Sequence, residues 1–318
     1  MSDIRVLITD KVHEKLVRML TACGLKVDYR PGISYSELLQ VVDNYDILVV
    51  RGRTKVTREV LERGTRGRLK LVARAGVGLD NIDLEAAKRL GVKVVNAPNA
   101  ATQSVAELTI GLMIAAARRL VELNLKLRGG SWVKGMGVEL AGKTLLVIGF
   151  GRIGRRVAEI AKAIGMRVIA YDVADVTEAA KRIGVELVDN LCDGIRMADV
   201  VTLHVPLTSS TYHMISEKLL RECFKPGTIL INTSRGAVVD TKAVLEAINN
   251  GLLLAYAADV LEHEPPETEY EKKLIEHPRV ILTPHIGAQT REAQERVAIE
   301  IVRRIVEELK LECRVNGV

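Results

Sequence analysis

The chain has 318 residues, enough for two domains of ordinary size, and 48% of them are hydrophobic, which excludes a disordered protein. Lys and Arg outnumber Asp and Glu by 46 to 40, and residues 51–74 hold this surplus, with nine basic side chains against Glu59 and Glu62. The longest apolar stretch, around 108–117, falls short of the roughly 20 residues that a membrane helix needs. We expect neither a membrane nor a nucleic acid as partner, so the basic segment needs another explanation.

The first hundred residues alternate between short β-branched runs and amphipathic helical patterns. Such alternation is typical of βα units, in which helical crossovers join parallel strands. It predicts strands over 4–8, 25–29, 46–50, 70–74 and 92–96.

The pattern changes at residue 102 to a long helical stretch, 103–128, whose apolar positions nearly encircle it. This predicts a buried helix. A second βα series follows and ends in a helical pattern over 291–310, which we expect to pack back on the first domain. The series predicts strands over 144–149, 166–172, 199–205, 228–234, 254–260 and 279–285.

These patterns predict an α/β protein with two doubly wound parallel-sheet, Rossmann-like domains and an active-site cleft between them. We expect a substrate-binding domain over 1–98 and an NAD-binding domain over 99–287. Residues 288–318 should return to the first domain.

The segment GFGRIG, residues 149–154, follows a predicted strand and opens a helical pattern. Gly149 permits the tight turn, Gly151 lets the backbone approach a pyrophosphate, and Gly154 allows close packing of helix on strand. Asp172 ends the next predicted strand, where its carboxylate suits ribose hydroxyls and would repel a 2′-phosphate. The segment therefore predicts a dinucleotide site that favours NAD over NADP.

Three polar residues follow predicted strands of the second half: Arg235, Glu264 and His285. Ligands of open α/β sheets bind at this carboxyl edge. The motifs around them, NTSRGAVVD, ADVLEHEPP and TPHIGAQT, resemble those of the NAD-dependent D-isomer 2-hydroxyacid dehydrogenases. ARAGVGLDNID and NAPNAATQSVAE are similar to further motifs of that family.

The resemblance implies that His285 is the general acid/base, that Glu264 orients its imidazole, and that Arg235 binds the substrate carboxylate. The amides of Val77 and Gly78 would meet the same carboxylate, and Asn99 would also contact the substrate. Further cofactor contacts are implied for Arg152, Ile153, Val205, Thr233, Ser234, Asp259, Gly287 and Ala288. NAD is the expected cofactor, with no metal.

Arg51, Arg53 and Arg74 follow predicted strands of the first domain, where a substrate phosphate would need cations. Within the family, these segments are most similar to the D-3-phosphoglycerate dehydrogenases. The expected reaction is therefore NAD-dependent oxidation of D-3-phosphoglycerate to 3-phosphohydroxypyruvate. The other bases of the segment are expected on a solvated helix face.

Two alternatives remain open: a glyoxylate or hydroxypyruvate reductase of the same family, and a non-catalytic dinucleotide sensor resembling the corepressor C-terminal binding proteins. The helix and arm over 100–142 suggest a homodimer or a dimer-based tetramer. The chain stops soon after its last helical pattern, so we expect no serine-binding regulatory domain.

The four cysteines lie far apart in sequence, without metal-ligand spacing. We expect reduced thiols and a cytoplasmic enzyme. Of the remaining histidines, His204 is expected to be packed in its strand. The others are expected at the surface: His13, His213, His263 and His277.

Overall fold

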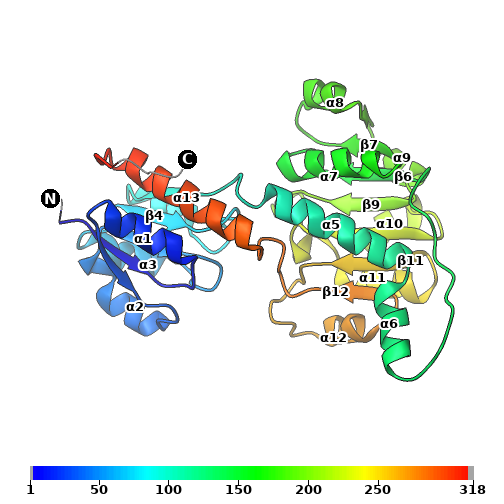
Figure 1. The fold of residues 1–318 in the computed structure, drawn as a ribbon, viewed down its shortest axis with the longest axis horizontal. Coiled ribbons are helices and arrows are strands. Elements are labelled where there is room, and N and C mark those ends of the chain that lie inside the picture. Colours follow the sequence, from blue (N-terminus) through cyan, green and yellow to red (C-terminus); the bar gives the residue numbers. More distant parts are fainter. Residues whose placement is uncertain (1–2, 314–318) are drawn as a thin grey trace. The chain divides into compact units, whose positions relative to one another are not determined.

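The computed structural model describes residues 3–313, and the chain forms two compact units (Figure 1). Unit 1 combines the chain up to Ala101 with the chain from Ala288 onward, and unit 2 spans Thr102–Gly287. Within the described residues, each unit is built on one parallel sheet, of five strands in unit 1 and seven in unit 2. The predicted class, two parallel-sheet α/β domains, is confirmed.

The sheet of unit 1 has the order β2-β1-β3-β4-β5. Its strand order reverses between β1 and β3, and the loops that follow these two strands diverge at such a switch point. The strands are β1 (Arg5–Ile8), β2 (Lys26–Tyr29), β3 (Ile47–Val50), β4 (Leu71–Arg74) and β5 (Lys93–Asn96). The helices are α1 (Glu14–Ala22), α2 (Tyr35–Val41), η1 (Val42–Asn44), α3 (Arg58–Thr65), α4 (Leu84–Arg89) and α13 (Arg291–Glu308).

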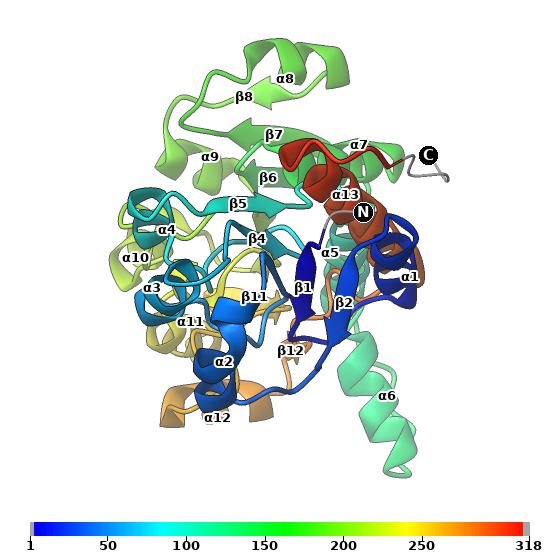
Figure 2. The same cartoon turned by 90° about the vertical axis from the view of Figure 1, so that its left-hand side faces the viewer.

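Helices α1 and α13 pack together on one face of this sheet, and α2, α3 and α4 cover the other (Figures 1 and 2). The last helix buries Val297, Ile301 and Ile305 at a spacing of four residues, which presents one apolar stripe to the sheet. In α1, Leu16 and Leu20 form the matching stripe. Burial of each such side chain contributes about 1.5–3 kcal/mol.

The sheet of unit 2 has the order β12-β11-β10-β9-β6-β7-β8, with its switch point between β6 and β9. The strands are β6 (Thr144–Ile148), β7 (Arg167–Tyr171), β8 (Glu186–Leu187), β9 (Val200–Leu203), β10 (Thr228–Asn232), β11 (Leu253–Ala258) and β12 (Val280–Leu282). The helices are α5 (Thr102–Ala117), α6 (Leu120–Arg128), α7 (Arg152–Ala163), α8 (Thr177–Ile183), α9 (Leu191–Met197), α10 (Glu217–Cys223), η2 (Gly236–Val238), α11 (Thr241–Asn249) and α12 (Glu269–Glu276).

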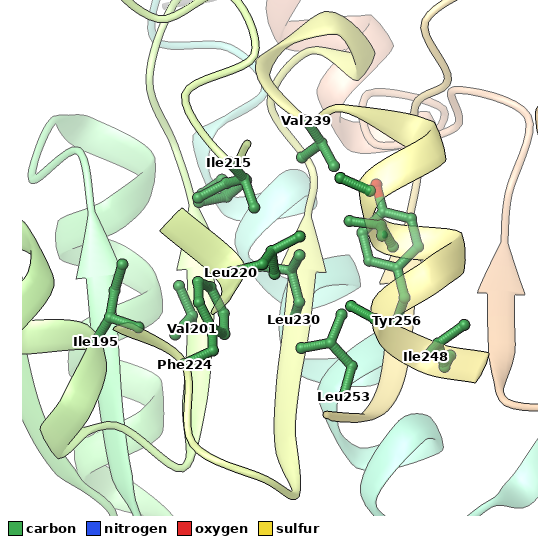
Figure 3. Packing of buried hydrophobic residues seen from close by; sticks show 14 of the residues in the cluster. Ile195, Val201, Ile215, Leu220, Phe224, Leu230, Val239, Ile248, Leu253 and Tyr256 are labelled. Atoms are coloured by element: carbon green, nitrogen blue, oxygen red, sulfur yellow. The ribbon is translucent and has the colours of Figure 1, made fainter. Parts of the chain in front are cut away.

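Hydrophobic side chains fill both faces of this sheet. Helices α5 and α7 contribute to the core on one face, while α9, α10 and α11 contribute to the core on the other. Around Leu230 of β10, side chains from α10, β9 and β11 meet, including Leu220, Val201 and Tyr256 (Figure 3). The buried strands hold the loops at their carboxyl ends in fixed positions.

The prediction of a single long helix over 103–128 is wrong. Helix α5 ends at Ala117, and α6 begins after Arg119, whose φ of 53° lies in the left-handed region. The amide of Val138 donates to the carbonyl of Ala117 at 2.9 Å, so the returning arm satisfies the end of α5. Helix α6 buries none of its residues, whereas α5 is buried along much of its length.

The expectation of reduced thiols is also wrong, because all four cysteines are paired. One disulfide joins Cys23, which follows α1, to Cys313, 290 residues away. The other joins Cys192 in α9 to Cys223 in α10. Each bond lies within one unit, and the sequence spacing alone gives no sign of either. No helix within residues 3–313 combines the length and apolarity that a membrane crossing needs.

Candidate functional site

The glycine turn of unit 2 lies at the switch point of its sheet, between the ends of β6 and β9. Gly149 has a φ of 91°, and a Cβ there would lie 2.7 Å from the carbonyl oxygen of His204. A Cβ on Gly154 would lie 2.1 Å from the carbonyl oxygen of Gly149. Both positions therefore require glycine, the first for its conformation and both for close packing.

A Cβ on Gly151 would meet nothing within 4 Å. This open space faces the start of α7, where Gly151 is the N-cap and no acidic residue lies in the first turn. The first amides of a helix bind anions, since they lack partners within the helix and carry its positive dipole end. The turn thus has the room and the donors that a pyrophosphate needs.

Asp172 follows β7, next to this turn. Its carboxylate accepts from the amide of Phe150 at 2.7 Å and from the amide of Ala174 at 2.9 Å. These bonds fix the carboxylate beside the phosphate turn. His204 follows β9, the strand next to β6. Its Nε2 forms a hydrogen bond with the hydroxyl of Thr202 at 3.0 Å, and burial lowers the pKa of its imidazole to about 3. Its ring is packed, as expected, and adds no positive charge.

The other predicted cofactor residues of unit 2 follow strands at the same edge of the sheet, because β12, β11, β10, β9 and β6 are parallel neighbours. Thr233 and Ser234 are buried after β10, and Val205 is partly buried after β9. Arg152 and Ile153 begin α7. Ala288 is the first residue of the chain's return to unit 1.

His285 and Glu264 are in direct contact. The imidazole Nδ1 lies 2.7 Å from Oε2 of the carboxylate, and about half of each side chain is exposed. His285 has a φ of 54°, and its amide donates to the carbonyls of Asp259 and Thr283. With Nδ1 engaged by the carboxylate, Nε2 is the ring nitrogen left to exchange a proton with a ligand.

Asp259 holds the turn that carries His285. Its buried carboxylate accepts from the amides of Ile286 and Gly287, at 2.8 and 2.7 Å, and from the hydroxyl of Thr283 at 2.6 Å. A carboxylate with three donors keeps this backbone in one conformation. The resemblance implies a cofactor contact for Asp259. Its role in holding the turn of His285 was not predicted, because it depends on contacts between the loops after β11 and β12.

Arg235 lies in the loop after β10, three residues beyond the end of the strand. Its Nη1 donates to the carbonyl of Ser234 at 2.8 Å, and its own carbonyl accepts from the side chain of Asn232 at 2.9 Å. A Cβ on Gly236 would lie 1.9 Å from the carbonyl carbon and oxygen of Leu261. The loops that carry Arg235 and Glu264 therefore touch at a point where only glycine fits. This packing role of Gly236 was not predicted from the sequence. The only sequence feature that points to it is its position next to Arg235 in the motif NTSRGAVVD.

In unit 1, Asp10 organises the loop that follows β3. Its buried carboxylate accepts from the amide of Arg51 at 2.6 Å and from the hydroxyl of Thr54 at 2.8 Å, and it pairs with Arg53 Nε at 3.1 Å. The guanidinium of Arg53 also donates to the carbonyls of Thr9 and Ile33. Arg53 thus has intramolecular partners at all three nitrogens, which favours a structural role.

Arg51 differs from Arg53. Asp10 fixes its amide, and Asn81 donates to its carbonyl at 2.9 Å. Its side chain is partly buried and makes no hydrogen bond or ion pair within residues 3–313. Burial lowers the pKa of Arg51, opposed by the nearby charge of Asp10. A desolvated cation on a fixed backbone is suited to binding an anion.

The remaining predicted substrate residues of unit 1 lie near the ends of β4 and β5. The guanidinium of Arg74 occupies the space where a Cβ on Gly76 would be. Val77 and Gly78 follow in the same loop, and Asn96 donates to the carbonyl of Val77. The side-chain amide of Asn99 donates to Glu300 of α13 at 3.4 Å, so Asn99 has a partner within unit 1.

Comparisons with known proteins agree with this geometry. Residues 110–287 match the family model described as D-isomer specific 2-hydroxyacid dehydrogenase, NAD binding domain. The D-3-phosphoglycerate dehydrogenase of Methanocaldococcus jannaschii is 44% identical over 99% of this chain, which spans 59% of that protein. The hydroxypyruvate reductase of Thermotoga maritima is 43% identical, over 97% of this chain and 99% of the relative.

Among solved structures, a D-lactate dehydrogenase from Aquifex aeolicus, complexed with NAD and lactic acid, is similar with a TM-score of 0.83. The two chains are 32% identical over 96% of this chain and 95% of that chain. A protein of Thermus thermophilus, TT0316, has a TM-score of 0.86 at 35% identity, over 98% of both chains.

Proposed function

Because the chain belongs to the D-isomer specific 2-hydroxyacid dehydrogenase family and binds NAD, we propose that it oxidises D-3-phosphoglycerate to 3-phosphohydroxypyruvate. The main support for a phosphorylated substrate is the environment of Arg51. Its guanidinium is partly buried on a backbone fixed from both sides, with no intramolecular hydrogen bond within residues 3–313. Arg74 is the second phosphate ligand of the proposal.

In this proposal NAD, held by the glycine turn over 149–154 and by Asp172, would supply the hydride acceptor for C2. His285 takes the proton of the C2 hydroxyl at Nε2, while Glu264 holds Nδ1 and stabilises the imidazolium that forms. Arg235 binds the substrate carboxylate, for which its planar fork provides paired donors. Asp259 supports this step by keeping the turn after β12 in place.

The test is NADH formation from a panel of 2-hydroxy acids in matched phosphorylated and unphosphorylated forms. We expect D-3-phosphoglycerate to have the highest kcat/KM of the panel. A kcat/KM for D-glycerate or glycolate equal to that for D-3-phosphoglycerate would contradict the phosphate assignment. Replacing His285 by Ala should abolish turnover while NADH still binds.

A second candidate is hydroxypyruvate or glyoxylate reduction. It is favoured by the Thermotoga maritima relative, which this chain matches over 99% of its length. The same site chemistry runs in reverse, with His285 donating the proton. Faster NADH consumption with hydroxypyruvate than with 3-phosphohydroxypyruvate would select this candidate. Binding of NADH by the wild type without turnover of any 2-hydroxy or 2-oxo acid would instead favour a non-catalytic dinucleotide sensor.

We also propose that a second copy of the chain covers α6 and the arm over 129–142. The exposed apolar side chains of this region would be shielded in such a homodimer. They are Leu120, Val121, Leu125, Leu127, Trp132, Val133, Met136 and Val138. Sedimentation at micromolar concentration should give twice the monomer mass, and a monomer would contradict the proposal.

A further inference from the structure

We propose that Glu262 is a positioning residue that fastens the loop of Glu264 to the loop of Arg235. The inference rests on the proposed function, since it concerns the same site. Glu262 lies two residues before Glu264 and is absent from the contacts that the family motif implies.

The carboxylate of Glu262 binds two other chain segments at once. Its Oε1 accepts from the amide of Thr241, the first residue of α11, at 2.8 Å. Its Oε2 lies 3.1 Å from Nε2 of His213. Side-chain exposure is only 17% for Glu262 and 29% for His213, so solvent screens this pair weakly. His213, expected at the surface, is therefore only partly exposed.

Both partners of Glu262 belong to the surroundings of Arg235. The amide of His213 donates to the carbonyl of Ala237, two residues after Arg235, at 2.8 Å. Nearby, Ile215 forms a β-bridge with Val239. The chain from Arg235 to Thr241 is therefore held between the segment of His213 and the loop that carries Glu262.

Glu262 is not needed to start α11, because that helix already has a cap. Asp240 is its N-cap residue, and its side chain accepts from the amide of Ala243 at 3.1 Å. The contact from Glu262 to Thr241 is additional, and it links two loops rather than closing one helix. A carboxylate at a helix N-terminus is also favoured by the helix dipole.

The loop between Leu261 and Glu264 has few internal bonds that could replace this link. The amide of Leu261 donates to Glu264 at 3.3 Å, a long bond within the same loop. Gly236 packs against Leu261 on the side of the Arg235 loop, and Glu262 adds a hydrogen bond to Thr241, which ends that segment. Removing the carboxylate should let Glu264 and Arg235 move relative to each other, and shifts of about 1 Å at an active site can cost up to 100-fold in rate.

The chain offers a matched control in the next residue. His263 belongs to the same loop but pairs with Glu271 of α12, which is not a partner of Glu262. A variant at His263 therefore disturbs the loop without touching the link. The conservative Glu262→Gln variant keeps an oxygen for the amide of Thr241 and a polar group facing His213.

The experiment measures kcat, KM for the 2-hydroxy acid that the wild type oxidises best, NADH affinity and thermal unfolding. We expect Glu262→Ala to lower kcat about tenfold and to raise KM several-fold, with NADH affinity unchanged within about twofold. Glu262→Gln should recover most of the loss, and His263→Ala should match the wild type. His213→Ala, which removes one partner only, should lower kcat about threefold and serves if Glu262→Ala does not fold.

Wild-type kinetics in folded Glu262→Ala would overturn the inference and leave the proposed function intact. Equal losses in Glu262→Ala and His263→Ala would also overturn it, because they would indicate general loosening of the loop. Absence of turnover on every 2-hydroxy acid in the wild type would instead overturn the proposed function, and the inference with it.

Discussion

Replacing Arg51 by Ala should separate phosphorylated from unphosphorylated substrates. Asp10 and Asn81 hold the main chain of Arg51 from both sides, so the loop should keep its shape when the side chain is removed. The loss is then that of the guanidinium alone. Hydrogen bonds to charged groups contribute about 1.5–3 kcal/mol, which corresponds to a decrease of roughly 10- to 100-fold.

The assay compares kcat/KM for 3-phosphohydroxypyruvate and hydroxypyruvate reduction in wild type and Arg51→Ala. We expect the decrease to fall on the phosphorylated substrate, with hydroxypyruvate changed by less than about threefold. The melting temperature should not fall, since burial lowers the pKa of Arg51 and already disfavours its charge in the free protein. Equal decreases for both substrates would refute the reasoning.

Arg53 provides the matched control, two residues along the same loop. Its guanidinium binds Asp10 and the carbonyls of Thr9 and Ile33. Arg53→Ala should therefore lower the free energy of unfolding by about 1–3 kcal/mol, because the buried carboxylate of Asp10 loses its cation. Any loss of activity should be similar for the two substrates.

Three further predictions concern backbone packing, crosslinks and assembly. Gly236→Ala should lower kcat and destabilise the protein by about 1–3 kcal/mol, because its Cβ would overlap the carbonyl of Leu261; calorimetry and turnover check this. Cys23→Ser should lower the free energy of unfolding by about 2–4 kcal/mol in denaturant titration, because it removes the crosslink to Cys313; an unchanged unfolding midpoint would contradict this. Leu125→Lys should convert the proposed dimer to a monomer in sedimentation, since this exposed side chain would be buried between copies.

Most strands were predictable because each is a short local run rich in apolar residues, such as the buried ILVV of β3 and TLLVI of β6. The run predicted over 46–50 is β3, Ile47–Val50, and the other predicted strands agree similarly well. The strand β8 was missed, since Glu186–Leu187 is too short to show a period. The break before α6 was missed for a different reason: Arg119 adopts a positive φ that no pattern of apolar residues reveals.

The site was predictable where its residues follow strands, because parallel strands bring their carboxyl ends to one edge. That rule and the motifs placed His285, Glu264 and Arg235 without any knowledge of contacts. Partners distant in sequence could not be found this way. Glu262 and His213 are separated by 49 residues, and Cys23 and Cys313 by 290. Such pairs are determined by how the loops pack in the folded protein, and no periodic pattern in the sequence indicates that packing.

Ion pairs within the basic segment over 51–74 separate Arg51 from most of the other cations of that segment. Most of its cations are paired with carboxylates, chiefly from the first fifty residues. The pairs are Arg53 with Asp10, Arg58 with Glu62, Arg63 with Asp43, Arg68 with Asp3 and Asp46, and Lys70 with Asp46.

Lys55 and Arg66 form no ion pair within residues 3–313, but both are exposed, where water solvates their charge at little cost. Arg51 is partly buried and lacks that compensation, so an anionic ligand would relieve a cost that the free protein bears. A nucleic-acid surface would instead present many exposed, unpaired cations. The pairing pattern therefore favours a small phosphorylated substrate at Arg51 over a polyanionic partner along the segment.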